Sequence, residues 1–180
     1  MHTVSRRRLL QFLAASPLFA RSALAEGLHP SDPVDLTWDL IKRLRDTVKV
    51  KLVLKGILGH EVAKLAAGAG IDAIVVSNHG GRVEDGVGAT IDVLPEIVEA
   101  VGGRMPILVD SGFRRGSDIV KALAAQAVCI GRPYLWGLGA FGQPGVERVL
   151  GILRAETRNV MQQLGAPSVK DLTPAMVRRV

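Results

Sequence analysis

The residues best suited to chemistry form one turn, Ser77-Asn78-His79-Gly80-Gly81-Arg82, which combines a base, a cation and two glycines. A neutral imidazole can take a proton from a substrate near pH 7. An arginine can bind a carboxylate through two parallel hydrogen bonds. The turn therefore favours His79 as a general base and Arg82 as a carboxylate ligand. The alternatives are a structural histidine and a surface ion pair between Arg82 and Asp85.

Four strand-helix units position this turn. We predict strands over residues 48–54, 71–76, 107–109 and 127–130, and helices over residues 38–47 (capped by Thr37), 60–67, 91–101, 116–124 and 145–164, with a short helical tail after Thr173. Repeated βα units form a parallel sheet, whose strands all end at one edge. The groups that follow the strands should therefore meet there: Lys55, residues 77–82, residues 110–115 and Gly131-Arg132.

Two of these groups suggest an anion-binding site. Residues 112–116 and 131–133 are rich in glycine and arginine. Glycine lets backbone N–H groups approach a phosphate, and arginine supplies charge. Together the two loops indicate a phosphorylated cofactor. Lys55 either holds negative charge in a ligand or is solvated, and Asp110 either accepts hydrogen bonds from ligand hydroxyls or caps a helix.

Composition limits the alternatives. The chain has 180 residues, 48% of them hydrophobic and 22% charged, which suits a globular domain with a substantial core. Four of the 23 basic residues lie in residues 1–25, and the remaining 19 nearly balance 17 acidic residues. A nucleic-acid partner is therefore not expected. The single cysteine, Cys129, is interpreted as a small core residue.

Residues 1–25 have the order of an export signal. Three arginines, Arg6 to Arg8, precede an apolar stretch, and Ala23-Leu24-Ala25 supplies small residues for cleavage. Paired arginines indicate a twin-arginine signal peptide and export, to the periplasm. A basic amphipathic helix is the alternative. We assign residues 26–36 to a linker and residues 37–180 to the folded domain.

The motifs resemble those of the FMN-dependent α-hydroxy acid dehydrogenase/oxidase family, which includes glycolate oxidase, lactate oxidase and L-lactate dehydrogenase. The matching stretches are residues 52–57, 76–82, 94–97, 108–116 and 130–137. The resemblance implies an oxidoreductase with FMN as cofactor, a small 2-hydroxy acid as substrate and a 2-oxo acid as product. It implies His79 as the base, Arg82 as the carboxylate ligand and Lys55 beside N1 and O2 of the flavin. It also implies FMN contacts for Ser77, Asp110, Ser111, Gly112, Phe113, Arg114, Gly131 and Arg132.

The family fold is a TIM (β/α)8 barrel, typically of about 250 residues, and the four units here resemble its last four. We therefore expect an α/β fold, a partial TIM barrel with two open sheet edges. Three outcomes stay open: a poorly folding fragment, a homo-oligomer that completes the barrel, and a non-catalytic half barrel that binds FMN or phosphate. Oxygen and a quinone or cytochrome stay open as electron acceptors. Val83 stands where the family usually has Gln.

Overall fold

The computed structural model describes residues 36–122 and 125–178. The chain divides into two compact units, Met1–Ile41 and Lys42–Val180, and the whole sheet lies in the second. The predicted signal over residues 1–25 and nearly all of the predicted linker lie outside the described residues. Within the part of the chain that is described, no helix is long and apolar enough to cross a membrane.

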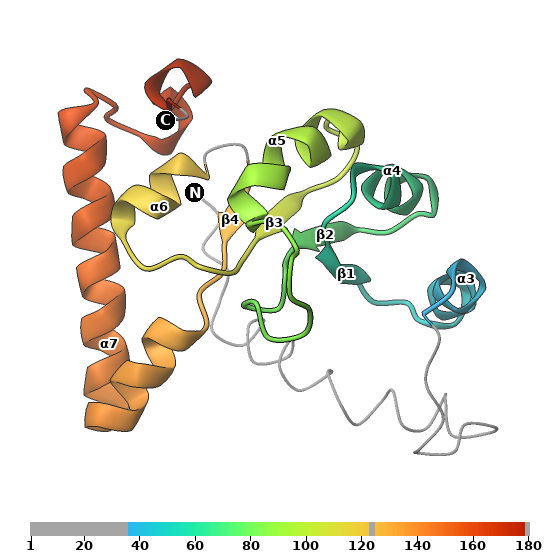
Figure 1. The fold of residues 1–180 in the computed structure, drawn as a ribbon, viewed down its shortest axis with the longest axis horizontal. Helices are drawn as coiled ribbons and strands as arrows, with labels where there is room; N and C mark the ends of the chain where they lie inside the picture. Colours follow the sequence, from blue (N-terminus) through green and yellow to red (C-terminus); the bar gives the residue numbers. More distant parts are fainter. Residues whose placement is uncertain (1–35, 123–124, 179–180) are drawn as a thin grey trace. The chain divides into compact units, whose positions relative to one another are not determined.

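The second unit contains a four-stranded parallel sheet in the order β1-β2-β3-β4 (Figure 1). The strands are β1 (Val53–Ile57), β2 (Ala73–Val76), β3 (Ile107–Val109) and β4 (Ala127–Val128). The helices are α3 (Trp38–Thr47), α4 (His60–Gly68), α5 (Thr90–Val101), α6 (Gly116–Lys121) and α7 (Arg132–Gln163), followed by the 3₁₀ turns η1 (Val169–Asp171) and η2 (Pro174–Met176). The predicted alternation of strands and helices is confirmed. Thr37 caps α3, because its Oγ1 accepts a hydrogen bond from Leu40 N at 3.3 Å.

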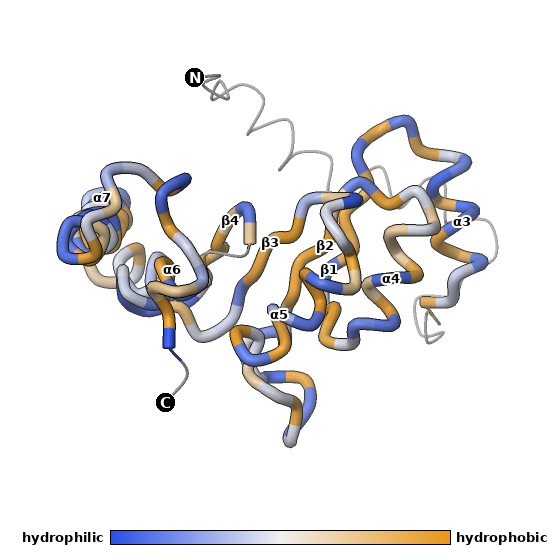
Figure 2. The backbone as a smooth tube through the Cα atoms, turned by 90° about the horizontal axis from the view of Figure 1, so that it is seen from above, coloured by the Kyte–Doolittle hydropathy of each residue, from blue (hydrophilic) through white to orange (hydrophobic). Residues whose placement is uncertain are grey.

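The register of the strands shows that the two faces of the sheet differ in their contacts and in their exposure to solvent. One set of cross-strand rows faces α4 and α5, which pack against each other and against β1 and β3 (Figure 1). Its central members, Ile74, Val76 and Val109, are fully buried. The alternate row runs from Lys55 through Val75 and Leu108 to Ala127, and both its ends are exposed. Figure 2 shows the hydrophobic character of the central strands.

Strand β1 begins later than predicted, at Val53 instead of residue 48. The guanidinium of Arg45 donates to the carbonyl oxygens of Val48 and Val50, at 3.0 and 2.9 Å. Leu52 N donates to the carboxylate of Asp72 at 2.8 Å. Side chains therefore bind the backbone groups that a longer strand would have used. At its other end, β1 continues to Ile57 and not to residue 54, so Lys55 lies inside the strand and not after it.

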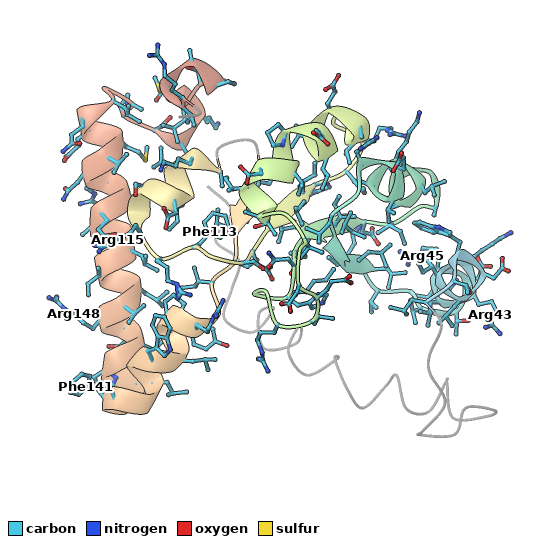
Figure 3. The ribbon with its side chains drawn as sticks, viewed as in Figure 1. Arg43, Arg45, Phe113, Arg115, Phe141 and Arg148 are labelled. Carbon is cyan, nitrogen blue, oxygen red and sulfur yellow. The ribbon has the colours of Figure 1, made fainter. Side chains whose placement is uncertain are left out.

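Helix α7 is longer than the predicted helix over residues 145–164. It begins at Arg132 and is broken at Gly142, which has φ 63° and ψ −144°. The two arms meet backbone to backbone, since a Cβ on Gly137 would lie 2.5 Å from the carbonyl oxygen of Gly145. Phe141 lies at the end of this hairpin (Figure 3). Elsewhere the prediction was too long, because α6 ends at Lys121 and β4 ends at Val128.

Candidate functional site

A cleft of about 470 Å³ lies at the carboxyl ends of the strands. It is lined by Lys55, His79, Gly80, Arg82, Val83, Asp110, Ser111, Gly112, Phe113, Arg114, Cys129, Ile130, Gly131, Arg132, Pro133 and Leu135. A larger cavity, about 660 Å³, lies between α6 and the C-terminal arm of α7. We take the smaller cleft as the candidate site, because it gathers a histidine, a lysine and a carboxylate where parallel strands place ligands.

His79 occupies a strained but well-held position in the cleft. Its backbone is left-handed, with φ 55°, a conformation that costs a non-glycine residue about 1–2 kcal/mol. Its N–H donates to Ser77 Oγ at 3.1 Å. Its ring packs on the backbone of Gly56, where a Cβ would lie 2.7 Å from His79 Cε1. Gly56 itself has φ 97°. The imidazole is exposed and aimed into the cleft, as general-base chemistry requires.

The two glycines after His79 bind three different parts of the fold. Gly80 N donates to Ser111 Oγ at 3.0 Å, and the Gly80 carbonyl accepts from Arg132 Nη2 at 2.9 Å. Gly81 N donates to Asn78 Oδ1 at 3.1 Å. Side chains from the end of β2, from the end of β3 and from the start of α7 therefore converge on one turn.

Lys55 and Asp110 form an ion pair beside this turn. Lys55 Nζ lies 3.2 Å from Asp110 Oδ2 and donates to Ser77 Oγ at 2.9 Å. Burial alone would raise the pKa of Asp110. Hydrogen bonds from Ser77, Ser111 and Lys55, with the charge of Lys55, outweigh burial and hold that pKa below its ordinary value. Asp110 is therefore a carboxylate at neutral pH.

A second layer fixes the end of β3. Ser111 donates to Asp110 Oδ1 at 2.7 Å and has a left-handed backbone, φ 75°. Thr90, the first residue of α5, is 2% exposed, and its hydroxyl donates to the Asp110 carbonyl oxygen at 2.6 Å. Thr90 is not among the site residues predicted from the sequence. The only sequence feature that could have indicated its role is its position, as a threonine that begins a helix after a glycine-rich loop.

The far end of the cleft is suited to an anion. Arg114 stacks on the ring of Trp136 at 4.6 Å, and its Nη1 is buried and has no hydrogen-bond partner among residues 36–122 and 125–178. Arg115 turns away and pairs with Glu156 of α7 at 3.5 Å (Figure 3). Gly112 and Gly131 line the cleft with open space where a Cβ would stand. A buried donor without an acceptor, beside two bare stretches of backbone, fits a phosphate group.

Arg82 is exposed on the wall of the cleft. Among the described residues no carboxylate pairs with it, so the alternative ion pair with Asp85 is not found. Val83 lines the cleft beside it. Arg82 therefore keeps its donors for a ligand.

Cys129 departs from its predicted place in the core. It is half-buried and lines the cleft, because β4 ends one residue before it. Burial and the nearby carboxylate of Asp110 raise the pKa of its thiol. The thiol is therefore protonated at neutral pH and poorly suited to nucleophilic chemistry.

The structure brings the predicted site residues together in this one cleft, with Ser77 as the exception. Ser77 is fully buried behind the lining residues, where its hydroxyl joins Lys55 to the His79 backbone. The support given by Gly56 and Thr90 and the lining by Cys129 and Leu135 were not predicted. Among the described residues, no group of three or more His, Cys, Asp or Glu is placed to hold a metal ion.

Comparison with known proteins identifies the family. The family profile described as FMN-dependent dehydrogenase matches residues 7–179. The chain belongs to this family. It is 48% identical over 160 residues to 2-hydroxyacid oxidase 1 of Mus musculus, covering 88% of this chain and 43% of the relative. It is 49% identical over 150 residues to L-lactate oxidase of Nostoc sp., covering 82% and 40%. It is 51% identical over 140 residues to pre-mycofactocin synthase of Mycolicibacterium smegmatis, covering 77% and 35%.

Solved structures agree with this assignment. A mandelate oxidase variant with a monooxide FMN adduct matches with a TM-score of 0.71 and 47% identity, over 74% of this chain and 43% of that chain. An (S)-mandelate dehydrogenase variant matches with a TM-score of 0.76 and 42% identity, over 80% and 41%. The α/β fold is thus part of a TIM barrel, as expected. The chain spans about two-fifths of the length of the relatives it matches.

FMN is the cofactor of this family, and the residues present fit it. The unpartnered Nη1 of Arg114 and the bare backbone at Gly112 suit its phosphate. Lys55 supplies a positive charge at the other end of the cleft. Asp110 lies between, with acceptor oxygens for hydroxyl groups.

Proposed function

We propose that this chain takes part in the FMN-dependent oxidation of a small 2-hydroxy acid, of the lactate or glycolate type, to the 2-oxo acid. One observation carries the proposal: a single cleft gathers an exposed imidazole, an arginine that pairs with no described carboxylate, and a buried arginine nitrogen with no hydrogen-bond partner in the described part of the chain. These groups match a base, a carboxylate ligand and a phosphate ligand. The family and the printed names of the relatives support the reaction class.

In this proposal His79 takes a proton from the substrate, and Arg82 holds the substrate carboxylate. The proton comes from the hydroxyl group if the carbon delivers a hydride, or from the carbon itself if it is removed first. FMN, when bound, accepts the two electrons that the substrate releases. The ring of His79 packs on Gly56, and its backbone N–H binds Ser77 Oγ. These contacts hold the imidazole in place, which either route requires.

The same proposal assigns the cofactor contacts. Lys55 would hold the flavin ring and would supply a positive charge that stabilises the anion of its reduced form. Asp110 accepts hydrogen bonds from the ribityl chain and keeps Lys55 oriented. Ser111, Phe113 and the phosphate residues Gly112, Arg114, Gly131 and Arg132 complete the set.

The test is FMN binding and reduction by the full chain. We expect visible absorbance of bound FMN, and its bleaching under anaerobic conditions by lactate, glycolate or mandelate. His79→Asn should keep FMN bound and slow reduction by about 10² to 10⁴-fold, since asparagine tolerates the left-handed backbone at this position. The control is His60→Asn, at an exposed histidine that opens α4. Equal reduction rates in His79→Asn and wild type would remove His79 from the mechanism.

A second candidate function is binding without turnover. The observation that favours it is coverage, since about three-fifths of each relative has no counterpart here. Within the described residues, the outer edges of β1 and β4 have no strand partner. Bound FMN or phosphate with no reduction by any 2-hydroxy acid would support this candidate, and measurable turnover would exclude it.

Assembly and export belong to the proposal as well. A second copy could pair its β1 with β4 and complete a barrel as a homo-oligomer, which sedimentation at several protein concentrations would detect.

Residues 1–25 would direct export to the periplasm by the twin-arginine route. Replacing Arg6 and Arg7 by lysine should then hold the chain in the cytoplasm, where cell fractionation would find it.

A further inference from the structure

The arginine that opens α7 contacts both the anion end of the cleft and the catalytic turn. Arg132 lines the cleft next to Gly131 and Pro133, and its Nη2 donates to the carbonyl oxygen of Gly80 at 2.9 Å. A guanidinium carries five N–H donors. This is the one hydrogen bond of the Arg132 side chain within the described residues, and no carboxylate there pairs with it. Its remaining donors are therefore available to an anion.

The turn that Arg132 touches needs external support. His79, Gly80 and Gly81 have φ of 55°, 73° and 68°, three left-handed residues in succession. The N–H of Gly80 is held by Ser111 Oγ, and its carbonyl by Arg132. Arg132 thus supplies one of the two bonds that fix the peptide groups of Gly80. Because Gly80 has no side chain, the guanidinium can approach closely: a Cβ there would lie 3.2 Å from Nη2.

We propose that Arg132 is a positioning residue that couples the anion end of the cleft to the His79 turn. An anion that binds the free edge of the guanidinium restrains its position, and the opposite edge then holds the Gly80 carbonyl more firmly. By linkage, an ordered turn strengthens anion binding to the same extent. The inference rests on the proposed function, in which this anion is the phosphate group of FMN. The cofactor would then order the base that serves it.

Arg114 provides a matched comparison. Both arginines line the anion end, and Arg114 has a buried nitrogen to which no described residue is hydrogen-bonded. The guanidinium of Arg114 stacks on Trp136, and its backbone N–H donates to Asp118. Within the described residues, no hydrogen bond joins Arg114 to Gly80. Loss of either arginine should weaken anion binding, but loss of Arg132 alone should disconnect the anion from the turn.

The experiment uses the full chain without FMN and inorganic phosphate as the probe. Amide hydrogen exchange at Gly80 and Gly81 is followed by NMR in phosphate and in sodium chloride of equal ionic strength. Gly102, whose N–H binds Val98 O at the end of α5, is the internal reference. We expect saturating phosphate to slow exchange at Gly80 by about fivefold or more, with no change at Gly102.

The variants decide the outcome. Arg114→Gln should need more phosphate and still reach the full slowing at saturation. Arg132→Gln should show none, and Arg132→Lys should retain anion binding without the slowing, since one ammonium lacks the two edges of a guanidinium. Retained folding is checked by far-UV circular dichroism.

Full slowing in Arg132→Gln would overturn the inference, as would phosphate binding to wild type without slowing, or no phosphate binding at all. FMN binding and reduction, followed by visible absorbance, report separately on the proposed function. Coupling can fail while FMN is bound and reduced, so the two failures are distinguishable.

Discussion

Two aspartates at opposite ends of the central strands, Asp72 at the amino end of β2 and Asp110 at the carboxyl end of β3, are held in different ways. Asp72 lies just before β2, and its carboxylate accepts from Arg45 Nη1 and Lys51 Nζ, both at 2.6 Å, and from Leu52 N at 2.8 Å. Asp110 lies just after β3 and accepts from Ser111 and Lys55. Both pKa values are lowered. The two groups differ in what surrounds them.

The Asp72 group is closed. Arg45 uses its other donors on the carbonyl oxygens of Val48 and Val50, so its contacts stay within the protein. The Asp110 group is open, because Arg82 and Arg114 line the same cleft and have donors that no described residue binds. A cluster whose donors are all bound within the protein stabilises the amino end of a strand. A cluster that keeps unbound donors can bind a ligand. This difference separates a structural ion cluster from a binding site in the same fold.

Among the variants that test this difference between the two groups, Gly56→Ala should have the largest effect, and it acts on the open group. The new Cβ would meet His79 Cε1 at 2.7 Å, and φ 97° disfavours alanine. A displaced base slows flavin reduction by about a hundredfold, while FMN affinity changes less. Stopped-flow reduction of the FMN complex measures this. Gly59→Ala is the control, since its Cβ would make an ordinary 3.7 Å contact with Val62. A Gly56→Ala chain that is reduced at the wild-type rate would contradict the packing of His79 on Gly56.

Thr90→Val tests the support beneath the open group. Valine keeps the shape but loses the hydroxyl that donates to the Asp110 carbonyl oxygen at 2.6 Å. Because Thr90 is 2% exposed, we expect the free energy of unfolding to fall by about 1–2 kcal/mol. Urea unfolding measures the change. Thr47→Val, which removes an exposed hydroxyl that binds Arg43 O, should cost less. Equal losses in the two variants would show that the Thr90 bond has no special weight.

The sequence predicts the parts of this fold that depend on local pattern. The apolar run at residues 107–109 forms β3 with the predicted bounds, and its two outer residues, Ile107 and Val109, are buried in the core. The predicted start of β1 was wrong, because two local hydrogen bonds from Arg45 and one long-range hydrogen bond to Asp72 use backbone groups of residues 48–52. The arm of α7 before Gly142 was missed, because its glycines resemble a loop. Their use is backbone contact between Gly137 and Gly145, which composition does not reveal.

The site follows from topology more than from local pattern. Because the ends of parallel strands meet at one edge, the order of strands and helices is enough to predict that Lys55, His79 and Asp110 lie together. The roles of Gly56 and Thr90 are not predictable in this way, since they depend on a ring that packs on one and a carbonyl that turns toward the other. Such contacts come from tertiary packing and leave little trace in local sequence.

Asp72→Asn acts on the closed group and has a pH signature. The pKa of Asp72 is lowered to about 2, first by the hydrogen bond from Lys51 and then by that from Leu52 N. A group with a lowered folded pKa stabilises above its unfolded pKa of about 4 and loses that effect as the pH falls towards 2. The urea midpoint of the variant should therefore lie below wild type at pH 7, with the gap closing below pH 4. A gap that does not change with pH would contradict the ion pairing.

Lys51→Ala should have the smallest effect, although its contact with Asp72 is as short as that of Arg45. Lys51 is 74% exposed and holds one carboxylate oxygen, whereas Arg45 is 26% exposed and also binds two carbonyl oxygens. Exposed ion pairs contribute little, because water competes and a long side chain must be ordered. Lys51 makes the largest contribution to the lowered pKa of Asp72, but solvent screens this exposed pair, so its share of the stability is small. The urea midpoint of Lys51→Ala should fall only slightly, and that of Arg45→Ala should fall clearly. If the two fell equally, charge on Asp72 would matter more than the backbone bonds of Arg45, and the closed group would owe its stability to electrostatics alone.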